Sequence, residues 1–210
     1  AMIPQFSQAE TDNFVAPPAQ IPEALGVLMF NMERGVNLPE IQEFLRDCPD
    51  IQPFDVILAN ELDDGCARSG NKNTARELAQ AFGLNYAWGL EFIELVNDEN
   101  AKGFHGNAVF SRWPIRRAGV IRLPEQYNWY FDRQKRIGGR LAVFAELDVG
   151  GQPVGAVSIH LENRTHGEGR KAQMAAILEA VRKELPDMPL ILGGDLNTNC
   201  LIYTSDAADD

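Results

Sequence analysis

The sequence is poor in cysteine and contains no long apolar run. Its three cysteines, Cys48, Cys66 and Cys200, are odd in number and lack the spacing of metal ligands, so we interpret them as free thiols rather than as a disulfide framework. No apolar run approaches the length of a membrane-spanning helix, and no signal-peptide pattern is visible at the start. These absences predict a protein without stable membrane insertion.

Basic residues are also scarce, since 19 lysines and arginines stand against 30 aspartates and glutamates, giving a formal net charge of -11. Such a chain is not built for tight, non-specific binding to a polyanion. A nucleic-acid or phospholipid substrate remains compatible with this charge, because a bound divalent cation can reverse it locally. The sequence starts at Ala1, so the natural start can lie upstream. A cytoplasmic location is favoured, and export stays open.

The length of 210 residues and the hydrophobic content of 45% suit one globular domain with a sizeable core. No internal repeat and no linker between two cores is visible, and we expect a monomer. Residues 1–24 are polar and rich in proline, which predicts an extended, loosely ordered lead-in. The domain itself is expected to begin at residue 25 and to continue to residue 199.

Apolar periodicity along the domain predicts strands and helices in a mixed α/β arrangement. The expected strands are 25–30, 55–59, 86–95, 107–111, 120–123, 140–149, 153–160 and 190–192, and the expected helices are 38–46, 74–82 and 168–185. Strands 140–149 and 153–160 alternate around Gly150-Gly151, which indicates a hairpin. The aromatic and arginine-rich stretch 124–136 is expected to be a loop.

The segment 190–199 combines a buried strand with polar residues at its end. The apolar residues 190–192 are followed by two glycines, and then Asp195 and Asn197 flank one leucine. Residues two apart on an extended chain point the same way, so a carboxylate and an amide emerge side by side. The carboxylate can accept a proton from water, and the amide can hold that water or a phosphate oxygen. A turn that merely caps the strand is the alternative.

Polar side chains follow several other apolar strands in the same way. Asn31, Glu61 and His160 each stand at or just beyond the end of one, as Asp195 and Asn197 do. Oxygen ligands of this kind suit Mg²⁺ or Mn²⁺, which accept one or two carboxylates together with water and substrate phosphate. The recurrence predicts that the five side chains meet in one cleft at the strand ends.

Each of these residues also has a plainly structural interpretation. Glu61 can be a solvated acid in a loop, Asn31 a turn residue, and His160 a structural histidine at a strand end. Arg136 and Arg140 can bind phosphate, or they can pair with the many acidic residues. No single residue decides between structure and function, and only the ordered set does.

That ordered set resembles the endonuclease/exonuclease/phosphatase superfamily, the metal-dependent phosphoesterases that include pancreatic deoxyribonuclease, abasic-site endonucleases, neutral sphingomyelinases and inositol polyphosphate 5-phosphatases. The matching segments are Asn31-Met-Glu-Arg-Gly35, Asn60-Glu61, Gly106-Asn-Ala-Val-Phe-Ser-Arg112, Ser158-Ile-His160 and Gly194-Asp-Leu-Asn197. They occur in the right order over residues 25–199, and Gly-Asp-Leu-Asn is the most specific of them. The resemblance implies a four-layer sandwich, with two mixed β-sheets face to face and helices outside.

The resemblance also implies a role for each matching residue. Glu61 corresponds to the metal-binding glutamate, and Asn31 to the asparagine that helps at the metal site. Asp195 corresponds to the residue that orients or deprotonates the attacking water, Asn197 to its phosphate-positioning partner, and His160 to the first of two catalytic histidines. The implied reaction is in-line attack of a water on a phosphoester, assisted by Mg²⁺ or Mn²⁺.

The substrate is less well defined than the reaction. Nucleic acid, a phospholipid headgroup and a sugar or inositol phosphate all stay open, as does the choice between monoester and diester. Asn107 and Arg140 are further candidates for contacts to the substrate phosphate. Trp129, Tyr130 and Phe131 can line a substrate cleft, touch lipid or belong to the core. A catalytically inactive binding module of the same fold is the alternative function.

The sequence departs from the family pattern after Asn199. The family continues with a strand and a catalytic Asp-His pair, whereas no histidine follows Asn199 here. Residues 200–210 resemble the translation of a sequencing-library adapter, differing from its common form only at Ile202, and a genuine acidic tail is the alternative. We expect this tail to be non-native, the last strand region to be missing, and the 210-residue chain by itself to be inactive.

Overall fold

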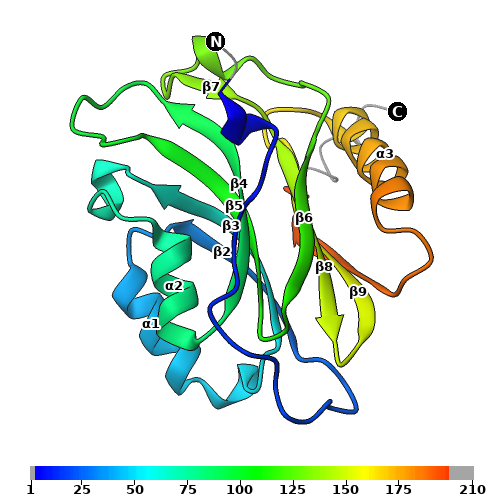
Figure 1. Cartoon of the computed structure of the whole chain (residues 1–210). Coiled ribbons are helices and arrows are strands. Elements are labelled where there is room, and N and C mark those ends of the chain that lie inside the picture. Colours follow the sequence, from blue (N-terminus) through cyan, green and yellow to red (C-terminus); the bar gives the residue numbers. More distant parts are fainter. Residues whose placement is uncertain (1–2, 199–210) are drawn as a thin grey trace.

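The computed structural model describes residues 3–198, and the segment 200–210 therefore lies outside the described residues. Two β-sheets pack face to face, with helices on both outer sides (Figure 1). The helices α1 (Leu38–Asp47) and α2 (Thr74–Phe82) cover one sheet, and α3 (Gly167–Glu184) covers the other. This arrangement confirms the predicted four-layer sandwich of mixed sheets.

Both sheets combine parallel and antiparallel pairs. Within the described residues the larger sheet has the order β1-β4-β5-β3-β2, with β7 paired to β4, and the smaller has the order β10-β9-β8-β6. The larger sheet contains β1 (Glu10–Asp12), β2 (Val27–Arg34), β3 (Val56–Asp64), β4 (Asn85–Glu94), β5 (Phe104–Ser111) and β7 (Arg136–Gly138). The smaller sheet contains β6 (Ile115–Arg122), β8 (Leu141–Val149), β9 (Gln152–His160) and β10 (Leu190–Asp195). The pairs β2–β3 and β9–β10 are parallel, and the others are antiparallel.

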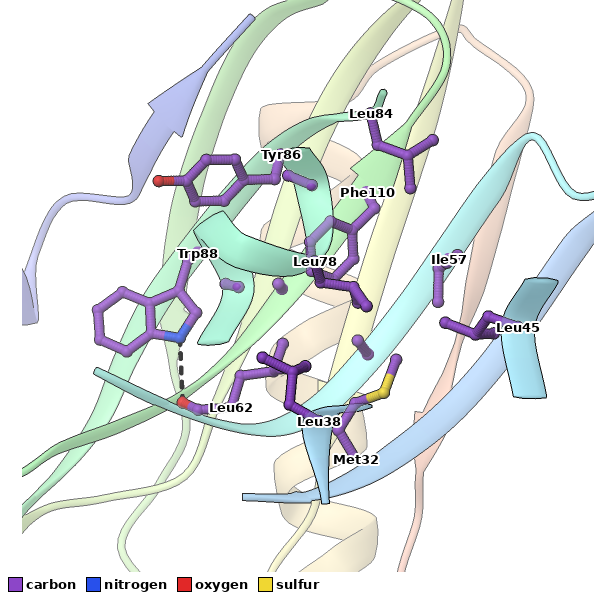
Figure 2. Close-up of a cluster of buried hydrophobic side chains, with 14 of the residues drawn as sticks. Met32, Leu38, Leu45, Ile57, Leu62, Leu78, Leu84, Tyr86, Trp88 and Phe110 are labelled. Atoms are coloured by element: carbon purple, nitrogen blue, oxygen red, sulfur yellow. Dashed lines mark hydrogen bonds between the residues drawn. The ribbon is translucent and has the colours of Figure 1, made fainter. Parts of the chain in front are cut away.

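Strand β3 shows why the central strands read as continuous apolar runs. Val56 and Leu58 belong to the core between the two sheets, whereas Ile57 and Ala59 belong to the core under α1 and α2. Successive side chains on a strand point to opposite faces, so a strand covered on both faces is apolar at consecutive positions, as residues 56–59 are. Figure 2 shows the cluster under the helices, where Nε1 of Trp88 donates to the Leu62 carbonyl at 3.3 Å.

Helix α2 has the start and stop signals of its sequence in place. The side chain of Asn73 accepts a hydrogen bond from the Arg76 amide at 2.9 Å, and Gly83 closes the helix in the left-handed conformation with φ of 60°. Glycine adopts this conformation without the steric cost of a Cβ. The predicted helix over 74–82 is therefore confirmed, and Gly83 ends it.

The structure corrects three expectations about which segments form regular structure and where. The lead-in was expected to be loose, but β1 pairs with β4, and Phe6 and Phe14 pack against the core. The stretch 124–136 contains a short 3₁₀ helix, η4 (Trp129–Phe131), and its last residue begins β7. The strand expected at 120–123 begins already at Ile115, because it pairs with β8 along most of its length. Other 3₁₀ turns are η1 (Pro4–Phe6), η2 (Pro49–Ile51) and η3 (Ala67–Ser69).

Strands β2 and β10 form neighbouring sheet edges within the described part of the chain. Apolar side chains remain accessible there, since Met29 is 56% exposed and Leu190 is 45% exposed. Such edges expose unpaired backbone groups as well as apolar surface, as expected for strands with an uncovered side. Among the described helices, none combines the length and the apolar character that a membrane span requires.

Candidate active site

Four neighbouring strands bring the predicted site residues together. His160 and Asp195 end their strands as expected, whereas Asn31 and Glu61 lie inside β2 and β3, next to irregularities in pairing beyond which both strands continue. Parallel pairing sets Asn31 of β2 beside Asn60 of β3, and Asp195 of β10 beside His160 of β9. The two sheets meet at this edge, where the Asn60 side chain accepts a hydrogen bond from the Asp195 amide at 2.8 Å. Glu61 is the next residue along β3. Residues separated by up to 164 positions in sequence thus lie in one place.

Asn60 is the buried connection between the sheets. Its Nδ2 donates to the Ile159 carbonyl at 3.0 Å and lies 3.3 Å from Oδ1 of Asn107. Its Oδ1 accepts the hydrogen bond from the Asp195 amide. A buried amide on one sheet that satisfies backbone groups of the other sheet fixes their relative position. The sequence contains this residue only as part of the Asn60-Glu61 motif, and its structural task was not predicted.

Asp195 presents a partly exposed carboxylate whose two oxygens are separately held. Oδ2 accepts a hydrogen bond from Nδ2 of Asn31 at 3.1 Å and lies 3.8 Å from Nε2 of His160. Oδ1 accepts from the Asn197 amide at 2.8 Å. The carboxylate is therefore oriented but keeps access to water, which a general base requires.

The side chains of Asn197 and Asn107 differ in which of their groups already form hydrogen bonds. Asn197 adopts a left-handed conformation with φ of 51°, and its Nδ2 donates to the Leu161 carbonyl at 2.8 Å. Asn107 is fully buried, and its Oδ1 accepts from the Glu61 amide at 3.2 Å. Within the described residues Nδ2 of Asn107 has no hydrogen-bond partner. Phosphate contacts by both residues stay predictions.

Glu61 is turned toward solvent by a break in strand pairing. The register of β3 shifts against both neighbours around Asn60-Glu61, and Glu61 has a positive φ of 58°. A bulge of this kind re-aims a side chain, and a positive φ in a non-glycine residue costs about 1 kcal/mol or more. The strain coincides with a carboxylate that lines a cavity. Strained backbone of this kind concentrates at functional sites.

His160 is held by a buried glutamate that the sequence analysis missed. His160 is 2% exposed, and its Nδ1 lies 3.2 Å from Oε2 of the fully buried Glu91 on β4. Burial by itself would raise the pKa of Glu91, but the positive charges of His160 and Arg140 outweigh it and lower that pKa. The available signal was a charged residue inside an otherwise apolar strand, because a buried charge requires partners.

His105 extends the same chain of titratable groups. Its Nδ1 lies 2.8 Å from Oδ1 of Asp63, and its Nε2 lies 3.9 Å from Oε2 of Glu91. A line of acids and histidines thus runs from Asp63 through His105 and Glu91 to His160. His105 lies directly before the Gly106-Asn107 motif, and the sequence offered no partner for it.

The pair of Asp63 and His105 predicts a measurable acid dependence of stability. Burial raises the pKa of Asp63, but hydrogen bonds and charges from Arg68 and His105 outweigh it and lower this pKa to about 2. Because the pKa is depressed in the folded state, the stabilisation is fully present above about pH 4 and is lost as pH falls toward 2. We expect this group to contribute about 2 kcal/mol to the free energy of unfolding at neutral pH.

Urea unfolding of the wild type and of Asp63→Asn between pH 2 and 7 checks this prediction. The variant is expected to be less stable at pH 7 and to show a flatter pH dependence between 2 and 4. The exposed Asp98 provides a matched control, since Asp98→Asn should keep the wild-type profile. Parallel profiles for Asp63→Asn and the wild type would contradict the assignment.

A polar cavity of about 470 Å³ opens beside these groups. Glu61, His105 and Arg140 line it, together with Trp129 and further arginines. Nη1 of Arg140 lies 3.0 and 2.9 Å from the two ring nitrogens of His160 and also contacts Glu91. Arg140 thus connects these two buried residues to the cavity that it lines. The cavity combines a carboxylate, positive charge and an adjacent base, which is the composition of a site for an anionic substrate.

The donor chemistry of the site fits a hard divalent cation. Among the described residues, the Glu61 carboxylate makes no hydrogen bond, and its nearest cation is Nε of Arg34 at 4.0 Å. Asn31 offers a second oxygen donor on the adjacent strand. Within the described residues no three His, Cys, Asp or Glu side chains cluster as metal ligands, so water and substrate phosphate would complete the shell, as Mg²⁺ tolerates.

Comparison with known proteins decides the family. Residues 30–205 match the profile of the Endonuclease/Exonuclease/phosphatase family. The chain belongs to this family. The match spans most of the sequence and includes every motif on which the resemblance was based. No curated protein sequence matches this chain at a significant level.

Solved structures of the endonuclease/exonuclease/phosphatase fold are similar to this one. A family member from Beutenbergia cavernae has a TM-score of 0.60 and 22% identity, covering 87% of this chain and 53% of that one. The human nocturnin catalytic domain has 0.58 and 20%, covering 99% and 74%. A mannosyl-6-phosphatase from Bacteroides thetaiotaomicron has 0.58 and 16%, covering 89% and 71%. The chain thus spans about half the length of the first structure, and these likenesses show the fold.

Proposed function

We propose that this protein hydrolyses phosphoester bonds with the help of Mg²⁺ or Mn²⁺. The observation that carries the proposal is the position of Asp195, whose carboxylate is oriented by Asn31 and lies 3.8 Å from Nε2 of His160. At this separation Asp195 can accept a proton from the attacking water while His160 donates a hydrogen bond to an oxygen of the phosphate under attack. Family membership supports the same chemistry.

Each residue of the site has its own role in the proposed reaction. Asp195 accepts the proton of the attacking water, and Asn31 keeps its carboxylate in place. Glu91 fixes the orientation of the His160 ring at Nδ1, and the protonated ring donates from Nε2 to a phosphate oxygen. Glu61 and Asn31 would hold the cation. When bound, it would stabilise negative charge on the phosphate and make the water more acidic.

Arg140 supplies a fixed positive charge next to His160. Its guanidinium contacts Glu91 at 3.3 Å and Asn163 at 3.2 Å and stacks on the Trp129 ring, so it is positioned before substrate arrives. Preorganised charge of this kind stabilises a transition state without reorganisation during the reaction.

A panel of phosphoesters assayed on the full-length protein tests the proposal. The panel contains p-nitrophenyl phosphate, bis-p-nitrophenyl phosphate, a sugar phosphate, a short DNA and sphingomyelin, each with Mg²⁺ and with EDTA. We expect hydrolysis with Mg²⁺, its loss with EDTA and its return when metal is added back. Phosphate binding without turnover of any member would instead establish the inactive binding module.

A further inference from the structure

The cavity beside Glu61 is basic although the protein is acidic. The chain carries a formal net charge of -11. Five arginines line this one cavity against two acids, Glu61 and Asp132. The arginines are Arg34, Arg133, Arg136, Arg140 and Arg164. A local excess of positive charge on a negative surface concentrates anions at that position.

Two of these arginines form a rigid wall. The guanidinium groups of Arg136 and Arg140 lie 5.0 and 5.6 Å from the Trp129 ring centroid, and 5.3 and 5.4 Å from that of Phe92. Both side chains are only 5% exposed. Nε of Arg136 pairs with Glu94 at 3.0 Å, and its Nη2 donates to Gln134 at 2.6 Å. Among the described residues no hydrogen bond uses Nη1 of Arg136. Stacked and anchored guanidinium groups lose little entropy when they bind an anion.

Two further arginines of the lining make no close ion pair among the described residues. Arg133 and Arg164 are exposed side chains in the cavity lining. In the part of the chain that the structure covers, neither forms an ion pair within 4.0 Å, although acidic residues outnumber basic ones overall. The proposed hydrolysis does not use them, because Arg140 and His160 already stand at the reacting phosphate. Their charge therefore remains available to a further anionic group.

We propose that the substrate is a small molecule with two phosphate groups, the second of which binds to Arg133, Arg136 and Arg164. This inference rests on the proposed function and names its substrate class. Guanidinium groups match the geometry of phosphate oxygens through paired N–H donors. The cavity volume of about 470 Å³ falls in the range of small-molecule pockets.

Matched pairs of substrates test the second phosphate site. The pairs are glucose 1,6-bisphosphate with glucose 6-phosphate, and adenosine 3′,5′-bisphosphate with adenosine 5′-monophosphate. We expect at least one bisphosphate to exceed its partner in kcat/KM by about tenfold or more, the size expected of charge-assisted hydrogen bonds. In the double variant Arg133→Gln/Arg164→Gln this ratio should fall toward one. Lys135→Gln is the control, because Lys135 neighbours Arg133 but lies over the Tyr130 ring outside the cavity lining.

A binding measurement separates this inference from the proposed function. Calorimetry in EDTA compares methylenediphosphonate with methylphosphonate on the wild type and the double variant. Tighter diphosphonate binding that the double variant loses would support the site even if no substrate were hydrolysed. Hydrolysis with equal kcat/KM within both pairs, or a preference for a single-stranded oligonucleotide over both bisphosphates, would overturn the inference and leave the hydrolase standing.

Discussion

In the full-length protein, replacing Asp195 by asparagine is expected to lower kcat by about 10³-fold, within the range that general-base catalysis contributes. The substitution keeps the shape of the side chain, and its remaining oxygen can still accept the hydrogen bond from Asn31 or from the Asn197 amide. It removes the proton acceptor that faces water. The melting temperature should consequently stay close to that of the wild type. Steady-state kinetics at saturating Mg²⁺ and a thermal unfolding scan measure the two effects.

The opposite pattern would return Asp195 to the structural interpretation of the Gly-Asp-Leu-Asn turn. A loss of several kcal/mol of stability without a specific kinetic defect would show that the carboxylate only closes the loop after β10. Asp187→Asn is the matched control, because Asp187 is an exposed aspartate that stands apart from the site and the cavity lining. This control variant should keep the wild-type kcat.

Replacing Glu61 by glutamine is expected to raise the Mg²⁺ concentration needed for half-maximal activity by about 100-fold or more, exceeding the effect of losing an outer-shell ligand partner. The glutamine keeps the shape and the strained backbone but removes the negative charge that faces the cavity. Folding should change little, since no described hydrogen bond depends on this carboxylate. Activity titrated against Mg²⁺ gives the measurement.

The exposed Glu99 supplies the control for this titration, and Glu99→Gln should leave the metal dependence unchanged. Calorimetric titration of Mg²⁺ into both variants provides a readout that does not depend on turnover. If Glu61→Gln retained full activity at limiting metal, Glu61 would be a solvated acid, as its loop-like sequence context allows.

Long periodic elements were predictable from the sequence because their signals are local. The helix over 74–82 carries its cap at Asn73 and its stop at Gly83, and β8 and β9 alternate around their glycine turn. Strands β1 and β7, at three residues each, were not predictable, because their only support is pairing with β4. Strand β3 was cut short at the polar pair Asn60-Glu61, since a bulge hides the continuation of the strand.

The site was predictable where its residues follow an apolar run in the sequence, and hidden where a charged residue interrupts one. Asn31, Glu61, His160 and Asp195 follow apolar runs, and the structure brings them together. Glu91 supports His160 from the middle of β4, and no sequence pattern connects residues 69 positions apart. The arginine wall likewise depends on two aromatic rings from separate elements. Tertiary packing alone creates these contacts.

The position of oxygen transfer tests the central claim most directly. The full-length protein is incubated with its best phosphoester substrate and Mg²⁺ in water enriched in ¹⁸O, and both products are analysed by mass spectrometry. Attack by an Asp195-activated water on phosphorus predicts one ¹⁸O in the phosphate-bearing product and none in the alcohol, with all incorporation abolished by EDTA. Label in the alcohol, or label in the phosphate that persists in EDTA, would contradict metal-assisted hydrolysis at phosphorus.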